Sequence, residues 1–109
     1  MYLINGGNFR ELKGQSVQLG REKDVFEEIE EYEIKVNTGD TIYMFSDGFP
    51  DQRGGPKRKK FYYPPFRQMF IDMQELKMED QLNRISEIMD DWKGDNEQMD
   101  DMLVIGIRF

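Results

Sequence analysis

Two short runs of β-type residues at the start of the chain predict a hairpin. The runs extend from Tyr2 to Ile4 and from Phe9 to Leu12. The residues between them, Asn-Gly-Gly-Asn at 5–8, include the glycines that a tight turn with positive φ requires. We therefore expect two antiparallel strands at the N-terminus.

The middle of the chain contains two further strand patterns. Tyr32, Ile34 and Val36 alternate with charged residues, and this period of two is typical of a half-buried strand. Residues 41–45 form a nearly continuous β-branched and aromatic run, which favours a strand buried on both faces. A turn sequence at 37–40 separates the two patterns, so we predict a second hairpin.

The second half of the chain predicts two amphipathic helices and a closing strand. Pro64 and Pro65 suit the first turn of a helix, and Gly94 suits the C-cap of the next one. The almost wholly apolar run from Met102 to Phe109 favours a central strand. These elements predict an α+β fold with a mainly antiparallel sheet and two helices. The apolar stripes at helical spacing are Phe66, Met69, Phe70, Met73 and Leu76, and then Leu82, Ile85, Met89 and Trp92.

Residue composition excludes several kinds of functional site. The 109 residues suffice for one small domain and include 0 Cys and 0 His. Disulfides, thiolate zinc sites, cysteine nucleophiles and imidazole acids or bases are therefore excluded. Carboxylates remain as the main catalytic candidates, and a metal that they bind would be a hard cation.

The net charge limits the kinds of partner. Acidic residues number 22 against 15 basic ones, which gives a net charge of -7. This excess disfavours nonspecific binding to nucleic acid or to an anionic membrane. No apolar run is long enough to cross a membrane. We expect a cytoplasmic chain without direct membrane contact, whether or not its parent protein is membrane-anchored.

Two groups of aspartates adjoin predicted strands. Asp47 follows the run at 41–45 and precedes Gly48, and Asp100 and Asp101 precede the closing strand. Each group by itself has an ordinary explanation, since Asp-Gly is a common turn pair and adjacent acids are common in solvated loops. Considered together, they form a set of oxygen ligands that suits Mg²⁺ or Mn²⁺.

Several sequence blocks resemble the metal-dependent protein phosphatases. The blocks are 39–48, 51–52 with 54–57, 92–94 and 98–105, and they occur in the family's order over nearly the whole chain. They are most similar to the bacterial SpoIIE-type serine phosphatase domain, which is related to protein phosphatase 2C. The resemblance implies an α-β-β-α sandwich, of which this chain would form a part.

The resemblance also implies the chemistry of the site. Asp47 and Asp100 match positions that ligate two Mn²⁺ or Mg²⁺ ions, and Gly48 and Asp101 lie next to these ligands. In that family a metal-bound water attacks a phosphoserine directly, so the resemblance implies no catalytic residue beyond the metal ligands. The parent protein would then be a protein serine/threonine phosphatase in bacterial signal transduction, and its substrate a phosphorylated regulatory protein such as an anti-sigma-factor antagonist.

The sequence departs from the family pattern in two ways. The family's N-terminal half has no counterpart, so we expect residues 1–109 to be the C-terminal part of the domain. Alone, the chain should then be inactive and bind metal weakly or not at all. Leu103 stands where the family usually has Thr or Ser, which predicts a looser environment around Asp100. The alternative function is a non-catalytic, phosphatase-like interaction module.

A basic segment and exposed strand edges suggest two kinds of contact. Residues 54–60 have the composition of an exposed loop and include Lys57, Arg58, Lys59 and Lys60. A single basic patch in an acidic chain argues against nucleic acid, and the two remaining interpretations are a solvated loop and a loop that attracts an acidic phosphoprotein. The absence of the N-terminal half would leave strand edges unpaired, which favours a homodimer.

Overall fold

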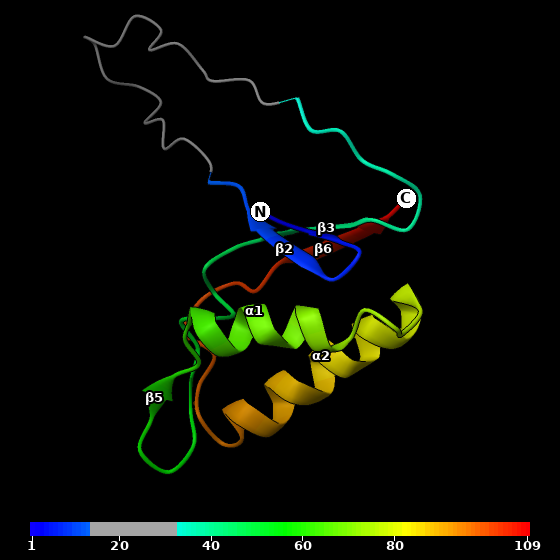
Figure 1. The fold of residues 1–109 in the computed structure, drawn as a ribbon. Helices are drawn as coiled ribbons and strands as arrows, with labels where there is room; N and C mark the ends of the chain where they lie inside the picture. The colour runs from blue at the N-terminus through cyan, green and yellow to red at the C-terminus, as the bar shows by residue number, and fades with distance from the viewer. Residues whose placement is uncertain (14–32) are drawn as a thin grey trace, which may run out of the picture.

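A four-stranded antiparallel sheet contains strands from both ends of the chain (Figure 1). The computed structural model describes residues 1–13 and 33–109. The sheet has the order β2-β1-β3-β6, and each neighbouring pair is antiparallel. Its strands are β1 (Tyr2–Asn5), β2 (Asn8–Glu11), β3 (Thr41–Phe45) and β6 (Val104–Arg108). The predicted α+β class with a mainly antiparallel sheet is therefore confirmed.

The predicted N-terminal hairpin is confirmed. Asn5 pairs with Asn8, which leaves Gly6 and Gly7 as a two-residue turn. Both glycines have positive φ, 51° and 87°. A two-residue turn of this kind needs positive φ at both positions, and glycine adopts it without steric cost.

The predicted second hairpin is wrong. Residues 33–37 form no strand, and Tyr32 lies outside the described residues. Strand β3 pairs with β1 on one side and with β6 on the other, so neither of its edges is free for residues 33–36. Burial on both faces of β3 is also wrong, because Thr41 and Tyr43 are buried whereas Met44 is 40% exposed.

The closing strand lies at an edge of the sheet, not in its centre. Within the described part of the chain, β6 has β3 as its single strand neighbour. Its apolar composition does not reflect burial on both faces, because Ile105 and Ile107 on the face away from the helices are each 42% exposed. Apolar residues on an uncovered face cannot be distinguished by composition from those of a strand buried on both faces.

Both predicted helices are present. They are α1 (Tyr63–Asp72), with prolines in its first turn, and α2 (Met78–Lys93). Gly94 caps α2 with a φ of 51°, and its N–H donates to the carbonyl oxygen of Asp90 at 3.0 Å. Leu76 lies beyond the end of α1 and Leu82 is 63% exposed, so these two predicted stripe residues are not in the core.

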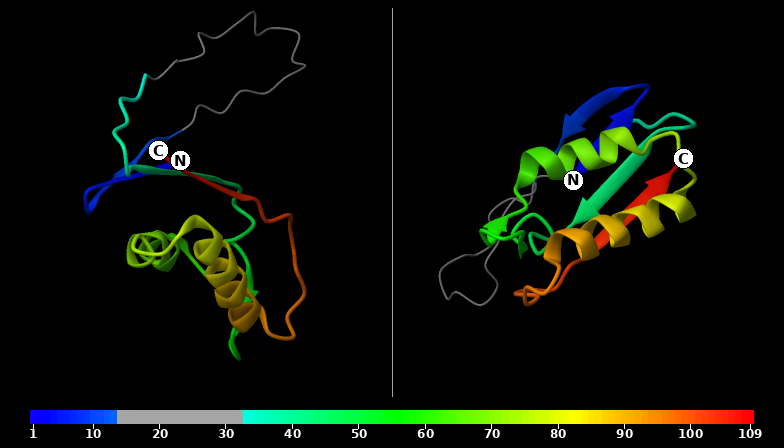
Figure 2. Two further views of the ribbon diagram at one scale, coloured as in Figure 1. Left: turned by 90° about the vertical axis from the view of Figure 1, so that its right-hand side faces the viewer. Right: turned by 90° about the horizontal axis from the view of Figure 1, so that it is seen from below.

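The helices cover one face of the sheet, and the core lies between these two layers (Figure 2). Aromatic rings fill much of this core. Tyr2 and Tyr43 from the sheet, for example, both contact Phe70 from α1. No helix among the described residues is long and apolar enough to span a membrane. The buried core residues are Tyr2, Ile4, Tyr43, Phe49, Phe66, Met69, Phe70, Met73 and Met89.

A buried polar network fixes the α1–α2 turn to the sheet. The Tyr43 hydroxyl donates to Oε1 of Gln81 at 2.6 Å and accepts from Nε2 of Gln74 at 2.7 Å. Nε2 of Gln81 donates to the carbonyl oxygen of Met73 at 2.9 Å. Burial raises the pKa of Tyr43, so its phenol stays a neutral donor. Arg108 of β6 also donates to the carbonyl oxygen of Gln74 at 2.8 Å.

The segment predicted as an exposed loop contains a second, smaller hairpin. Strand β4 (Arg53–Gly54) pairs antiparallel with β5 (Lys59–Lys60). Gly54 is buried, whereas residues 56–59 are exposed. The prediction of exposure is therefore correct for residues 56–59 and wrong for Gly54.

Candidate functional site

Asp47 lies in a tight turn directly after β3. Its side chain is exposed, and its carbonyl oxygen accepts a hydrogen bond from the N–H of Asp51 at 3.0 Å. The following residues, from Gly48 to Pro50, are buried. The turn therefore holds an exposed carboxylate on a backbone that is fixed by its neighbours.

Gly48 packs directly against the main chain of Asp101. A Cβ atom at position 48 would overlap the carbonyl oxygen of Asp101 and lie 2.8 Å from its carbonyl carbon. Real Cβ atoms do not approach that closely, so only glycine allows this contact. The two aspartate-bearing segments, more than 50 residues apart in sequence, are thereby adjacent in space.

Ser46 links the same two segments by hydrogen bonds. Its N–H donates to the carbonyl oxygen of Leu103 at 3.0 Å, and its hydroxyl donates to the carbonyl oxygen of Asp101 at 3.1 Å. The same hydroxyl accepts from the N–H of Leu103 at 3.0 Å. The sequence alone does not reveal Ser46 as a site residue, because only the fold brings it to Asp101.

Tyr63 is a second site residue that the sequence alone does not reveal. It is the first residue of α1, and its phenol donates to Oδ1 of Asp47 at 2.5 Å. This hydrogen bond, with smaller contributions from burial and from the charge of Asp47, raises the pKa of Tyr63. The phenol therefore stays protonated at neutral pH and holds one of the two carboxylate oxygens of Asp47.

Asp100 and Asp101 are both exposed at the entrance to β6. The N–H of Asp101 donates to Oδ1 of Asp100 at 2.7 Å, and Nε2 of Gln98 donates to the carbonyl oxygen of Asp100 at 3.0 Å. The structure thus packs Gly48 against Asp101, and Asp47 and Asp100 are their neighbours in the chain. The predicted effect of Leu103 on Asp100 remains a prediction.

The donor set fits part of a site for a hard cation. Carboxylates on two adjacent segments are the oxygen ligands that Mg²⁺ and Mn²⁺ prefer. Residues 1–13 and 33–109, however, contain no group of three or more Asp, Glu, His or Cys residues placed to hold a metal ion. The described residues therefore supply some of the ligands of such a site and not the whole set.

The small hairpin begins at this site. The N–H of Tyr62 donates to the carbonyl oxygen of Pro50 at 2.8 Å, and that of Phe61 donates to the carbonyl oxygen of Gln52 at 2.9 Å. Nε2 of Gln52 also donates to the carbonyl oxygen of Glu97 at 2.9 Å, in the segment that leads to Asp100. The predicted substrate-loop residues Lys57 to Lys60 thus lie on a hairpin that follows the turn of Asp47. The base of this hairpin contacts the segment that leads to Asp100.

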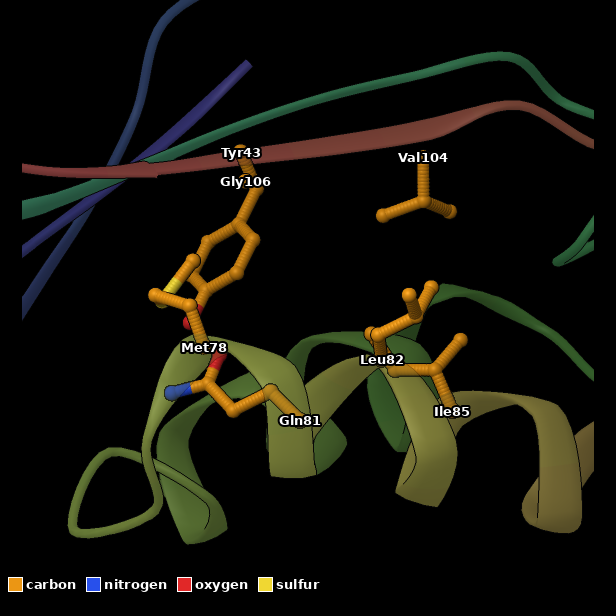
Figure 3. A pocket seen from close by; sticks show the side chains of 7 residues that line it. All are labelled: Tyr43, Met78, Gln81, Leu82, Ile85, Val104 and Gly106. Atoms are coloured by element: carbon orange, nitrogen blue, oxygen red, sulfur yellow. Dashed lines mark hydrogen bonds between the residues drawn. The ribbon is translucent and has the colours of Figure 1, made fainter.

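A separate apolar pocket lies between α2 and the β3–β6 edge (Figure 3). Its volume is about 200 Å³, and no carboxylate lines it. The pocket therefore lacks the donors that the candidate metal site needs. Its lining residues are Tyr43, Met78, Gln81, Leu82, Ile85, Val104 and Gly106.

Comparisons with known proteins relate the chain to one family. Residues 1–109 match the family model described as stage II sporulation protein E (SpoIIE). Among solved structures, the chain is similar to the SiaA-PP2C domain of Pseudomonas aeruginosa, with a TM-score of 0.81 and 26% sequence identity. The match covers 99% of this chain and 42% of that one, so the chain spans less than half the length of the solved neighbour. No curated protein matches the chain.

Proposed function

The chain belongs to the SpoIIE family, and we propose that it forms part of a metal-dependent phosphatase that hydrolyses phosphoserine on a regulatory protein. The family and the solved neighbour support a PP2C-like phosphatase domain, as the sequence resemblance predicted. We propose in addition that the substrate is a phosphorylated regulatory protein, that the metal is Mn²⁺ or Mg²⁺ and that the domain acts in bacterial signal transduction. A cytoplasmic location, in a parent protein that is free or membrane-anchored, belongs to the same proposal.

The contact between Gly48 and Asp101 is the observation that carries this proposal. It brings the turn of Asp47 against the segment of Asp100, the two residues that the resemblance identifies as metal ligands. Ser46 reinforces the contact through its hydrogen bonds to Asp101 and Leu103. Two turns that share a cation site must be held together, and the Gly48–Asp101 contact holds these two.

The residues of this chain have defined roles in the proposal. Asp47 and Asp100 supply carboxylate oxygens, and Tyr63 holds Oδ1 of Asp47 so that Oδ2 remains for a cation. Mn²⁺ or Mg²⁺ ions, when bound, supply a water of lowered pKa and neutralise charge on the phosphoryl oxygens. The remaining ligands would come from the part of the domain that this chain does not span.

The absence of a three-ligand group among the described residues favours one alternative, a phosphatase-like interaction module without catalysis. Such a module would keep the fold and bind a partner without turnover. The two functions differ in what they require of Asp47 and Asp100, because only catalysis depends on their carboxylates.

The test uses the complete phosphatase domain with a phosphoserine peptide and Mn²⁺. We expect metal-dependent release of phosphate, and Asp47→Asn or Asp100→Asn should lower kcat/KM by at least about 100-fold. Asp91→Asn, an exposed acid on α2, is the control with the same change of charge. Near wild-type turnover in either site variant would contradict the assignment, and a folded domain without turnover would support the module.

A further inference from the structure

One short segment concentrates the positive charge of an acidic chain. The basic hairpin, residues 53–60, contains Arg53 and the run from Lys57 to Lys60, which together are five of the 15 Lys and Arg residues. The net charge of the chain is -7. Lys60 pairs with Asp51 at 3.6 Å, and the other four cations form no ion pair within the described residues. Because both partners of that pair are about half exposed, most of this charge is available to a ligand.

The basic hairpin is fixed to α2. A Cβ atom on Gly54 would overlap the carbonyl oxygen of Trp92 and lie 2.6 Å from its indole nitrogen. The N–H of Gly55 donates to the carbonyl oxygen of Trp92 at 3.2 Å, and the indole N–H of Trp92 donates to the carbonyl oxygen of Gln52 at 2.9 Å. The guanidinium of Arg53 donates to the carbonyl oxygen of Arg58 across the hairpin at 3.0 Å. These contacts fix the main chain of the hairpin that carries the cations, which a solvated loop does not require.

The residues that flank the basic hairpin contact the two aspartate segments of the candidate site. Tyr63, just after the hairpin, holds Asp47, and Gln52, just before it, holds the segment that leads to Asp100. In Figure 1 the hairpin, marked by β5, projects away from the sheet beyond the start of α1. A molecule that presents a phosphoryl group to the aspartate turns would therefore have its neighbouring residues beside these cations.

We propose that the basic hairpin binds an acidic segment next to the phosphoserine of the substrate protein. The proposal rests on the proposed function and adds the chemistry that distinguishes one phosphoprotein from another. The acidic remainder of this chain repels such a segment, so its attraction is confined to the hairpin. A membrane or a nucleic acid would meet the same repulsion over a larger surface, which disfavours both.

The test measures binding to the full 109-residue chain, in the absence of metal, by fluorescence anisotropy. The probes are two labelled phosphoserine peptides that differ in one feature, since Asp and Glu flank the phosphoserine in one and Asn and Gln in the other. The triple variant Lys57→Gln, Arg58→Gln, Lys59→Gln removes three exposed cations from the hairpin. Its control, Lys35→Gln, Lys77→Gln, Arg84→Gln, removes three cations elsewhere and gives the same net charge.

We expect the wild-type chain to prefer the acidic peptide. The hairpin variant should bind the acidic peptide about tenfold more weakly than wild type, whereas the control variant should bind it within about twofold of wild type. The affinity for the peptide with Asn and Gln should differ little among the three proteins. Equal weakening in both variants, or no detectable binding of the acidic peptide at millimolar concentration, would overturn the proposal. Hairpin-dependent binding of single-stranded DNA or of phosphatidylserine vesicles that exceeds the binding of the acidic peptide would overturn it as well.

Failure of this inference and failure of the proposed function are distinguishable. Asp47→Asn should lower kcat/KM for phosphate release by the complete domain at least about 100-fold but keep the preference of the 109-residue chain for the acidic peptide. Loss of that preference in Asp47→Asn would contradict a separate role for the basic hairpin. Persistence of turnover in Asp47→Asn would contradict the phosphatase assignment and leave the binding result to stand on its own.

Discussion

The phenol of Tyr63 donates a hydrogen bond of 2.5 Å to Oδ1 of Asp47. The bond joins the first residue of α1 to the turn that follows β3. The helix layer therefore positions the carboxylate of Asp47 just beyond the end of this strand. Nothing in the local sequence of either residue predicts the pairing.

Tyr63→Phe removes this hydrogen bond and keeps the ring. We expect the free energy of unfolding at pH 7 to fall by about 1 kcal/mol, the usual contribution of a partly exposed hydrogen bond. The pKa of Tyr63 is raised in the folded protein, so its contribution is fully present below the ordinary tyrosine pKa of 10.0 and is lost as pH rises above that value. Urea unfolding of both proteins from about pH 7 to 11 should show the difference shrinking at high pH, and a constant difference would contradict this account.

Gly48→Ala tests the contact that holds the two aspartate segments together. The added methyl group would overlap the main chain of Asp101, which cannot yield as a flexible side chain could. We expect a loss of about 1–3 kcal/mol in the free energy of unfolding, the usual cost of overpacking. Asp47→Ala, at the adjacent exposed position, removes only the hydrogen bond from Tyr63 and should cost about 1 kcal/mol. A Gly48→Ala variant as stable as wild type would show that the contact is not close.

Two buried tyrosines should respond in opposite ways to the loss of their hydroxyl groups. Within residues 1–13 and 33–109, the buried hydroxyl of Tyr2 has no hydrogen-bond partner, whereas that of Tyr43 bonds to Gln74 and Gln81. Burial raises the pKa of Tyr2 to about 12, so this phenol is also neutral. We expect Tyr2→Phe to be neutral or stabilising and Tyr43→Phe to cost about 1–3 kcal/mol, because Oε1 of Gln81 loses its donor. Calorimetric melting of both variants checks this, and similar costs would contradict it.

The sequence predicted those elements whose signals are local. The hairpin turn at Gly6 and Gly7, the proline start of α1 and the Gly94 cap of α2 each depend on a few adjacent residues. Strand pairing does not, and for this reason residues 33–36 were wrongly assigned to β3 as a hairpin partner. An apolar pattern also cannot show which face of β6 is covered.

The candidate site was predictable only in part for the same reason. Asp47 and Asp100 could be selected because motifs carry them, but the packing of their two segments against each other depends on the contact between Gly48 and Asp101. Ser46 and Tyr63 act through partners 55 and 16 residues away, respectively. No spacing rule within a helix or a strand connects such positions.

The 109-residue chain alone should bind Mn²⁺ weakly and show no detectable turnover. Its described residues contain no group of three potential ligands, and two carboxylates cannot neutralise two divalent ions. Calorimetric titration with Mn²⁺ should therefore give a dissociation constant well above the micromolar range. Micromolar affinity, about 8 kcal/mol, would show that ligands had been overlooked.

The last prediction concerns self-association through β6. In the described part of the chain this strand has one free edge, and its Ile105 and Ile107 are each 42% exposed. A charged residue commonly protects such an edge, but Arg108 donates to the carbonyl oxygens of Gln74 and Leu76 on the helix side. We therefore expect the chain to form a dimer as its concentration rises, by strand pairing at β6.

Light scattering after gel filtration at several concentrations measures this association. Ile107→Lys places a charge on the uncovered sheet face next to the edge and should shift the protein to a monomer. Leu82→Lys, which changes a 63% exposed residue of α2, is the matched control and should leave the dimer intact. If the wild-type chain has the monomer mass at every concentration, the net charge of -7 is sufficient to keep the copies apart, and the edge of β6 is not an association site.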